Sequence, residues 1–359
     1  MIRQDYNGMT LRTRHGLTLI LIFALGLTAY PGNPDRQGEA GASELLLNPW
    51  ARSAGLHTMN TSWISGVEAM RLNVAGLVRI SKTQILISHA RYLQGTDVNM
   101  NAIGLGQKLG ENSAFGISIM AMDFGDIPVT TTAQPEGTGA TFSPNFFHLG
   151  IAYSHIFDNK VSVGFTLRLI SETTADLSAQ GAALDAGVQY VTGEKDNFKF
   201  GISLRNVGTP MRFNGEGLAF RGTNPDGQIN YDLTFDQRSA RFELPSVLNI
   251  GLSYDFLLDS RNRISLLGNF TSNSFSRDAL GGGLEYAFNE IFMIRAAYRY
   301  DLGSANDLVT NSVYSGLSAG VSIEIPFSKE SDTRLSMDYG YRATSPWNGT
   351  HNFSLRFTL

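Results

Sequence analysis

The sequence contains no cysteine among its 359 residues, so neither a disulfide framework nor a thiolate metal site can form within it. Charged residues are scarce at 17%, whereas ordinary soluble domains carry about a quarter. The net charge of -4 provides no overall basic field to attract nucleic acid. The mean hydropathy of -0.08 is too polar for a bundle of membrane-spanning helices. These deficits favour a β-barrel, in which lipid-facing apolar residues and polar lumen residues average out.

The longest apolar run lies near the N-terminus and is short. Leu17–Ala29 reads LTLILIFALGLTA, which is too short for a helix that crosses a bilayer. Arg12 and Arg14 precede this run, and small residues at its end offer a cleavage site, as in a secretory signal peptide. We therefore expect residues 1–29 to be removed, with Met9 as an alternative start. The competing interpretation is a short membrane anchor.

From residue 81 onward, one pattern recurs: apolar and polar residues alternate over about ten positions. In 161–169 the odd-numbered residues are apolar and the even-numbered ones are polar or small. The pattern predicts an all-β fold, a membrane-spanning antiparallel barrel of about 14 strands over residues 81–359. The expected strands start near residues 82, 98, 113, 144, 160, 180, 196, 246, 262, 280, 290, 313, 332 and 350.

The expected connections alternate between tight turns and long loops, as in outer-membrane barrels. Asp158-Asn159 and Asn289-Glu290 are the expected tight turns, and 126–143, 206–245 and 302–312 the long loops.

The chain ends on an amphipathic segment, His351–Leu359, with the sequence HNFSLRFTL. We expect this last strand to pair with the first, because closure removes the open edges that lipid cannot satisfy. A soluble β-sandwich also alternates, but it requires neither so many strands of similar length nor a closing terminal strand.

The polar faces of the expected strands carry many arginines interspersed with acids. This mixture favours a lattice of ion pairs and hydrogen bonds inside a narrow lumen over an anion-selective pathway. The residues are Arg168, Arg205, Arg295, Arg299, Arg334, Arg342 and Arg356, with Glu285, Asp301, Glu324 and Asp338.

The segment 30–80, between the expected signal and the first strand, does not alternate. Tyr30–Gly41 is polar and rich in turn residues, which predicts a flexible lead-in. Ser43–Ile80 is apolar enough to be packed and too irregular to be a strand. Irregular backbone at membrane depth must be buried in protein, so we expect a plug inside or beneath the barrel.

Several short motifs in a fixed order resemble the PorV/PorQ family, which is similar to the FadL-type barrels. The motifs are Ala51–Gly55, Ser65–Ala69, Asn73–Leu77, Glu243–Ser246, Gly281–Tyr286 and Ile294–Tyr300. Within the third, Asn73, Ala75, Gly76 and Leu77 match the Asn-Pro-Ala-Gly-Leu segment of the FadL hatch, and Val74 stands where Pro is usual. The resemblance covers nearly the whole chain after the signal and implies the same strand number.

The resemblance implies an outer-membrane component of the type IX secretion system of the Bacteroidetes group. Such a barrel would bind the translocon barrel or the C-terminal domains of cargo and help deliver exported proteins to the surface, in a PorV-like or a PorQ-like role. The long loops would then be its working surface, because exposed apolar loop tips are candidates for protein contact. The candidate partner-binding residues are Met211, Phe213, Leu218 and Phe220.

A second function stays open, because FadL-type barrels transport hydrophobic compounds. That function requires an apolar pocket beside the plug and a lateral exit, for which Gly281–Gly283 could kink the wall. An enzyme is not expected: no Ser, His and acid set stands out, and the 6 histidines lack metal-ligand spacing. We accordingly expect no cofactor and no metal.

Overall fold

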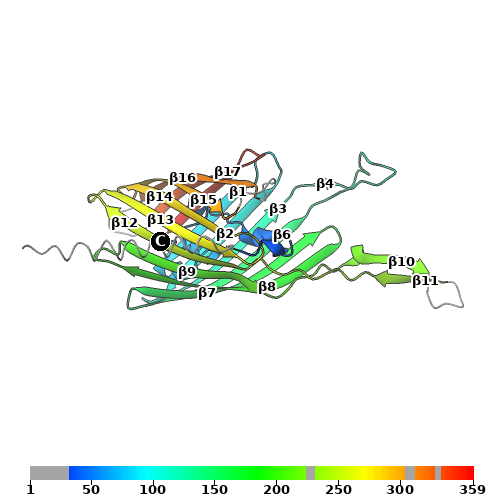
Figure 1. Cartoon of the computed structure of the whole chain (residues 1–359), viewed down its shortest axis with the longest axis horizontal. Helices are drawn as coiled ribbons and strands as arrows, with labels where there is room; N and C mark the ends of the chain where they lie inside the picture. Colours follow the sequence, from blue (N-terminus) through cyan, green and yellow to red (C-terminus); the bar gives the residue numbers. More distant parts are fainter. Residues whose placement is uncertain (1–31, 224–230, 304–311, 328–332) are drawn as a thin grey trace, which may run out of the picture.

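The computed structural model describes residues 32–223, 231–303, 312–327 and 333–359. The expected signal peptide, residues 1–29, lies outside these ranges. Fourteen antiparallel strands form one closed barrel, which confirms the predicted fold (Figure 1). Helices within the described ranges are all too short or too polar to cross a membrane. The barrel strands are β1 (Thr83–Arg91), β2 (Asn99–Leu109), β3 (Ser113–Asp123), β6 (Asn145–Phe157), β7 (Val161–Thr174), β8 (Leu177–Thr192), β9 (Phe198–Gly208), β12 (Val247–Leu257), β13 (Asn262–Asn273), β14 (Ala279–Phe288), β15 (Phe292–Asp301), β16 (Tyr314–Pro326), β17 (Arg334–Thr344) and β18 (Thr350–Thr358).

The barrel closes between its first and last strands, as the C-terminal pattern predicts. Strands β1 and β18 pair antiparallel from Gln84 opposite Thr358 to Arg91 opposite His351. Each remaining strand pairs with its neighbours in chain order around the wall. Closure therefore gives the edges of both terminal strands a partner, which a bilayer requires.

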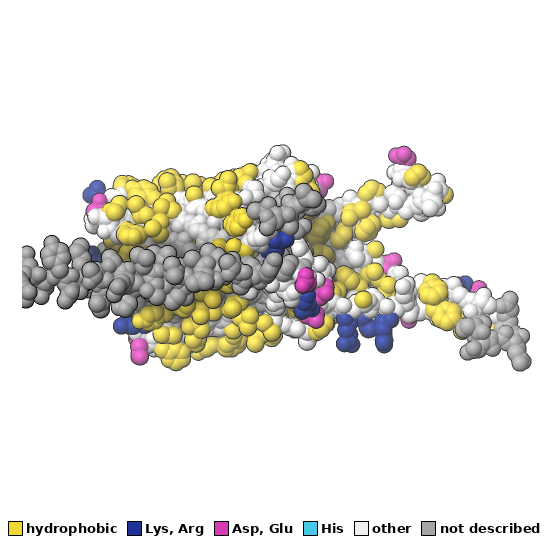
Figure 2. Space-filling model, viewed as in Figure 1, with side chains coloured by type: hydrophobic (Ala, Val, Ile, Leu, Met, Phe, Trp, Pro, Cys, Tyr) yellow, Lys and Arg dark blue, Asp and Glu magenta, His cyan; other side chains and the backbone are white. Residues whose placement is uncertain are grey.

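Along the barrel strands, apolar side chains are exposed and polar side chains are buried, the reverse of the distribution in a soluble protein. In β7, Phe165, Leu167 and Leu169 are exposed, whereas Thr166 and Arg168 are buried. Figure 2 shows the result, apolar side chains covering the outside of the barrel body. This surface matches hydrocarbon, and the buried polar face lines the lumen.

The two ends of the barrel differ in the length of their connections. At one end, the predicted turns Asp158-Asn159 and Asn289-Glu290 join neighbouring strands, and all four residues have positive φ, as a type I′ hairpin turn requires. At the other end, two hairpins project beyond the wall (Figure 1): β4 (Ile127–Pro128) with β5 (Thr141–Phe142), and β10 (Ala219–Thr223) with β11 (Asp232–Asp236). We name these the short-turn end and the long-loop end.

Residues 43–80, which precede β1, lie inside the barrel and form short helical turns (Figure 1). Residues 43–80 are mostly buried, although they contain no strand. We name them the plug. The helical turns are η2 (Pro34–Arg36), ahead of the plug, and η3 (Ser43–Leu46), α2 (Ala51–Ala54), η4 (Val67–Arg71) and η5 (Val74–Arg79) within it, and a further turn, η6 (Glu216–Leu218), precedes β10.

Candidate functional site

The chain passes through the lumen in one direction. At the long-loop end, Gly32 bridges to Arg277, and Ala40 bridges to Glu243. At the short-turn end, Ile80 leads into β1. The plug therefore runs the length of the lumen, with its N-terminal side at the long-loop end.

The lead-in before the plug is attached to the long loops rather than free, which differs from the expected flexible segment. The guanidinium of Arg36 pairs with Glu39 at 2.7 Å and with Glu243 at 3.4 Å, and it lies 4.3 Å from the centre of the Phe275 ring. The hydrogen bond that Arg36 donates to Glu39, together with the charges of both carboxylates, raises the pKa of Arg36. Polar composition alone could not distinguish a docked segment from a free one.

Glycines in the wall provide the space into which the plug fits. A Cβ on Gly340 would stand 2.3 Å from the Ala51 carbonyl oxygen, and one on Gly201 would stand 2.5 Å from the Thr61 carbonyl oxygen. Only a residue without a side chain lets the plug backbone approach this closely. The glycines on the polar strand faces thus mark where the plug contacts the wall.

The predicted hatch residues meet at the start of η5. Asn73 caps this turn by accepting a hydrogen bond from the Ala75 N–H at 3.3 Å, and its amide donates to the Thr61 carbonyl at 2.9 Å. Val74 takes the first helical position, which Pro also favours, so the turn forms without Pro.

Gly76 and Leu77 complete this turn and fix it against neighbouring parts of the plug and wall. The Gly76 carbonyl accepts from the Gly66 N–H at 3.0 Å, and a Cβ on Gly76 would stand 2.0 Å from the Ile64 carbonyl oxygen. Leu77 is fully buried in an apolar cluster with Met70. All four hatch residues are buried, so their observed role is to hold the plug.

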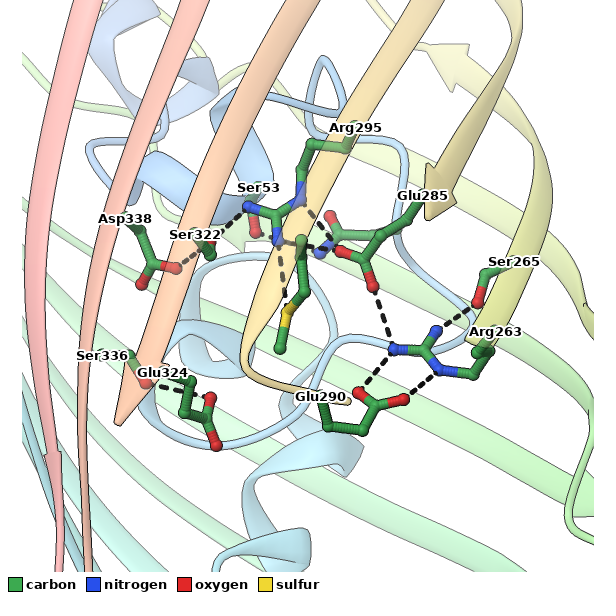
Figure 3. A network of polar contacts seen from close by, with 12 residues as sticks. Ser53, Arg263, Ser265, Glu285, Glu290, Arg295, Ser322, Glu324, Ser336 and Asp338 are labelled. Atoms are coloured by element: carbon green, nitrogen blue, oxygen red, sulfur yellow. Dashed lines mark hydrogen bonds and ion pairs between the residues drawn. The ribbon is translucent and has the colours of Figure 1, made fainter. Parts of the chain in front are cut away.

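The short-turn half of the lumen holds a charge-paired lattice (Figure 3). Glu285 pairs with Arg295 at 2.8 Å and with Arg263 at 3.2 Å, and Arg263 also pairs with Glu290 at 2.7 Å. Arg295 donates to Ser322 at 2.8 Å. In this half, the predicted lattice of ion pairs is confirmed.

A cavity of about 730 Å³ lies in the long-loop half, between the plug and strands β9, β12, β13 and β15 to β17. Its plug side includes Leu46, His57 and Met59. Among the described residues, the arginines that line it are Arg205, Arg277, Arg299 and Arg342, and the one lining acid is Asp301. The sequence predicts that arginines and acids are interspersed throughout the lumen, but arginines predominate around this cavity. The difference arises because strand register and barrel tilt determine which polar faces lie opposite one another.

The candidate partner-binding residues are divided between the interior and the surface. Met211 is fully buried beside the plug residue Leu45, and its backbone exchanges hydrogen bonds of 2.9 Å with Phe242. It is therefore unavailable at the surface, contrary to the expectation. Phe213 and Leu218 are half-buried, and Phe220 is 55% exposed.

Sequence patterns missed one partner of Phe220. Phe235, on the paired strand β11, stacks on Phe220 with ring centres 5.6 Å apart. The exposed Tyr231 and Leu233 extend this apolar face of the hairpin. Short alternation within 206–245 was the available signal for a hairpin there.

The described ranges contain no group of three or more His, Cys, Asp or Glu side chains placed to hold a metal ion. The lumen acids with the most contacts, such as Glu285, are held by arginines rather than left free for acid–base chemistry. The observed arrangement can close the lumen with the plug, and it offers the cavity and the loop hairpins as binding surfaces.

The sequence profile described as "Type IX secretion system protein PorV" matches residues 36–274, about two thirds of the chain. The chain belongs to the PorV family. PorV-family membership and the barrel fold place the protein in the bacterial outer membrane, which confirms the family and location expected from the motifs. No curated protein sequence matches this PorV-family chain.

Solved structures support the FadL-like architecture of this PorV-family barrel. A Pseudomonas aeruginosa FadL homologue aligns with a TM-score of 0.52 at 12% identity, covering 86% of this chain and 98% of that one. The CymD monoaromatic hydrocarbon channel aligns with a TM-score of 0.51 at 13% identity, covering 87% and 96%. A TodX monoaromatic hydrocarbon channel mutant gives 0.51 at 13% identity, covering 86% and 97%. At these identities the likeness concerns the fold alone.

Proposed function

We propose that this PorV-family barrel is a binding and delivery component of type IX secretion. Its long-loop end binds the translocon barrel or the C-terminal domains of cargo, and it helps deliver exported proteins to the cell surface. In this proposal residues 1–29 are the removed signal, 30–80 the lead-in and plug, and 81–359 the barrel. The observation that carries it is the hairpin β10–β11, which projects beyond the wall of a plugged barrel (Figure 1).

The hairpin has the composition of a protein contact. Phe220 and Phe235 stack, and Phe220, Tyr231 and Leu233 are exposed on a two-stranded support. Large aromatic side chains on a rigid element lose little conformational entropy when a partner covers them, and they dominate interface energetics. The barrel wall contacts outer-membrane lipid, which leaves the loop end for proteins.

The plug supports binding over conduction. Hydrogen bonds tie it to the wall on several sides, including Asn352 Nδ2 to the Pro49 carbonyl at 2.7 Å and Gln189 Nε2 to the Ile64 carbonyl at 2.9 Å. A lumen filled in this way delivers cargo along its outside or its loops, not through its centre.

The test is purification of a tagged copy from its own outer membrane in mild detergent, with mass spectrometry of the co-purifying proteins. We expect a very large translocon barrel, or cargo proteins that share a C-terminal β-domain. A Phe220→Ser and Phe235→Ser double variant should reduce this recovery at least about tenfold, the equivalent of ~1.4 kcal/mol.

The matched control is Leu258→Ser, because Leu258 is 62% exposed at the short-turn end. This variant also removes an exposed apolar side chain and should keep full recovery. Equal recovery from both variants would contradict the hairpin as the contact. Recovery of the barrel alone would contradict the secretion role.

The alternative function is a channel for hydrophobic small molecules, and one observation favours it. Pairing between β16 and β17 is interrupted between Tyr314 and Ser318, beside the cavity. The wall at Gly281–Gly283, in contrast, pairs without interruption on both sides. The same purification separates the two functions, because a transporter would carry bound apolar compounds and no secretion partner.

A further inference from the structure

The cavity differs from the short-turn half of the lumen in its charge balance. In the short-turn half, each of Arg263, Arg295 and Arg356 has an acidic partner within 3.2 Å. Among the described residues that line the cavity, Arg205, Arg299 and Arg342 face a single acid, Asp301. An uncompensated excess of buried positive charge is costly unless something of opposite charge joins it.

Two arginines of this cavity form no ion pair with a carboxylate of the described residues. Arg205 and Arg342 are only 5% and 3% exposed. Arg205 donates to the Leu45 carbonyl at 3.1 Å, and Arg342 donates to the Asn48 carbonyl at 3.5 Å. Over the described ranges, neither forms an ion pair with a carboxylate, and the Nε of each has no acceptor. The two guanidinium groups together carry ten N–H donors, and the acceptors that they reach are two uncharged carbonyl oxygens.

The other lining residues add donors and ring surface. Arg299 pairs with Asp301 at 3.2 Å and remains about one third exposed, so it can turn toward a ligand. The ring of Tyr314 lies 4.7 Å from the Arg342 guanidinium carbon, which holds that guanidinium in place. Tyr92, which is half-buried, also lines the same space.

We propose that this cavity binds a small organic anion that carries at least two negative charges, on carboxylate or phosphate groups. Arg205, Arg299 and Arg342 would bind the charged groups, and the tyrosine rings would pack against the body of the molecule. The forked guanidinium matches both carboxylate and phosphate, because it donates two parallel hydrogen bonds to the oxygens of either group. A cavity of about 730 Å³ is of the size that holds drug-sized ligands and is far larger than an inorganic ion needs.

The inference depends on the cavity alone and is independent of the proposed role in secretion. It differs from uptake of a hydrophobic compound, because an apolar ligand would leave buried guanidinium groups without acceptors.

The test is isothermal titration calorimetry of the full chain in a non-ionic detergent at fixed ionic strength. Citrate represents a carboxylate ligand, pyrophosphate a phosphate ligand, and sucrose a neutral one. We expect a dissociation constant below about 1 mM for citrate or pyrophosphate and no binding of sucrose. The tighter of the two anions identifies the charged group of the ligand.

Arg342→Gln should weaken this binding at least about tenfold, because one charged hydrogen-bonding group is lost. Because Arg342 is buried, Arg299→Gln provides a second variant at a more exposed site. The matched control is Arg334→Gln, at the short-turn end and 44% exposed, which should bind as the wild type does. Failure of both anions to bind, or equal affinity in all variants, would overturn the proposal.

Discussion

The carbonyl oxygen of Ala51 occupies the space that a side chain at position 340 would need, 2.3 Å from the ideal Cβ position of Gly340. Ala51 begins the α2 turn of the plug, and Gly340 faces the lumen from the middle of β17. The plug can therefore occupy its observed place only if residue 340 has no side chain.

Gly340→Val should loosen or displace the plug without preventing barrel closure. Overpacking of this kind costs about 1–3 kcal/mol, and a backbone carbonyl cannot move aside as a flexible side chain can. Limited proteolysis should then cut residues 43–80, and the heat-modified shift on gels should occur at a lower temperature. Gly268→Ala is the control, because this glycine is exposed on the outer face with only the Gly281 oxygen at 4.0 Å. A plug that stays protected in Gly340→Val would contradict this relationship.

Glu285 and Glu290 allow a comparison of buried and exposed partners of one arginine. Both pair with Arg263, but the side chain of Glu285 is fully buried and that of Glu290 is 51% exposed. Glu285→Ala leaves the buried Arg295 without its acid and should cost about 3–5 kcal/mol. Glu290→Ala should cost only about 0–1 kcal/mol. Urea unfolding in detergent or lipid measures both; similar losses would show that the lattice does not depend on burial.

Deletion of Phe353–Leu359 should abolish stable assembly, because it removes most of the strand to which both β1 and β17 pair. The remaining wall would present two open edges to lipid. The measurement is the amount of heat-modifiable protein in the outer membrane. Deletion of the hairpin residues 219–236 is the control and should leave that amount unchanged. Normal levels of the C-terminal truncation would contradict the closure argument.

The direction of the plug can be tested with single cysteines, because the chain contains none. Asp35 is exposed in the lead-in at the long-loop end, and Glu111 is exposed in a turn at the short-turn end. If the long loops face outward, a membrane-impermeant maleimide should label Asp35→Cys on intact cells. Glu111→Cys should react only after the outer membrane is permeabilised. The reverse labelling pattern would show that the short-turn end faces outward.

N-terminal sequencing of the mature protein tests the expected signal. Cleavage after Ala29 would leave Tyr30 as the first residue, two positions before Gly32 contacts the long loops. An unprocessed chain would instead support the membrane-anchor interpretation.

Strand positions were predictable from the sequence, because lipid outside and polar groups inside impose alternation on every strand. All fourteen observed starts lie within three residues of the expected ones, the largest difference being Leu177 against 180. The plug was predictable for the opposite reason, since its apolar sequence lacks any alternation.

Three features were not predictable, because each depends on which strand faces meet across the lumen. Met211 follows a strand and has a loop-like sequence, yet it packs against Leu45, 166 positions earlier, in a cluster beside the wall. The grouping of Arg205 and Arg342 around one cavity depends on strand tilt and stagger. The docking of the lead-in on the long loops depends on the path of the plug.

Because of that path, the plug should respond differently to a pulling force applied from one end of the barrel than from the other. The plug is covalently joined to β1 at the short-turn end, whereas backbone bridges at Gly32 and Ala40 attach its N-terminal side at the opposite mouth. Tension applied from the short-turn side acts through the covalent joint and draws the plug out in the direction of β1. Tension applied to the N-terminal side from the long-loop end pulls against that joint. If the long loops face outward, we expect the barrel to be unplugged more readily from within the cell envelope than from the environment.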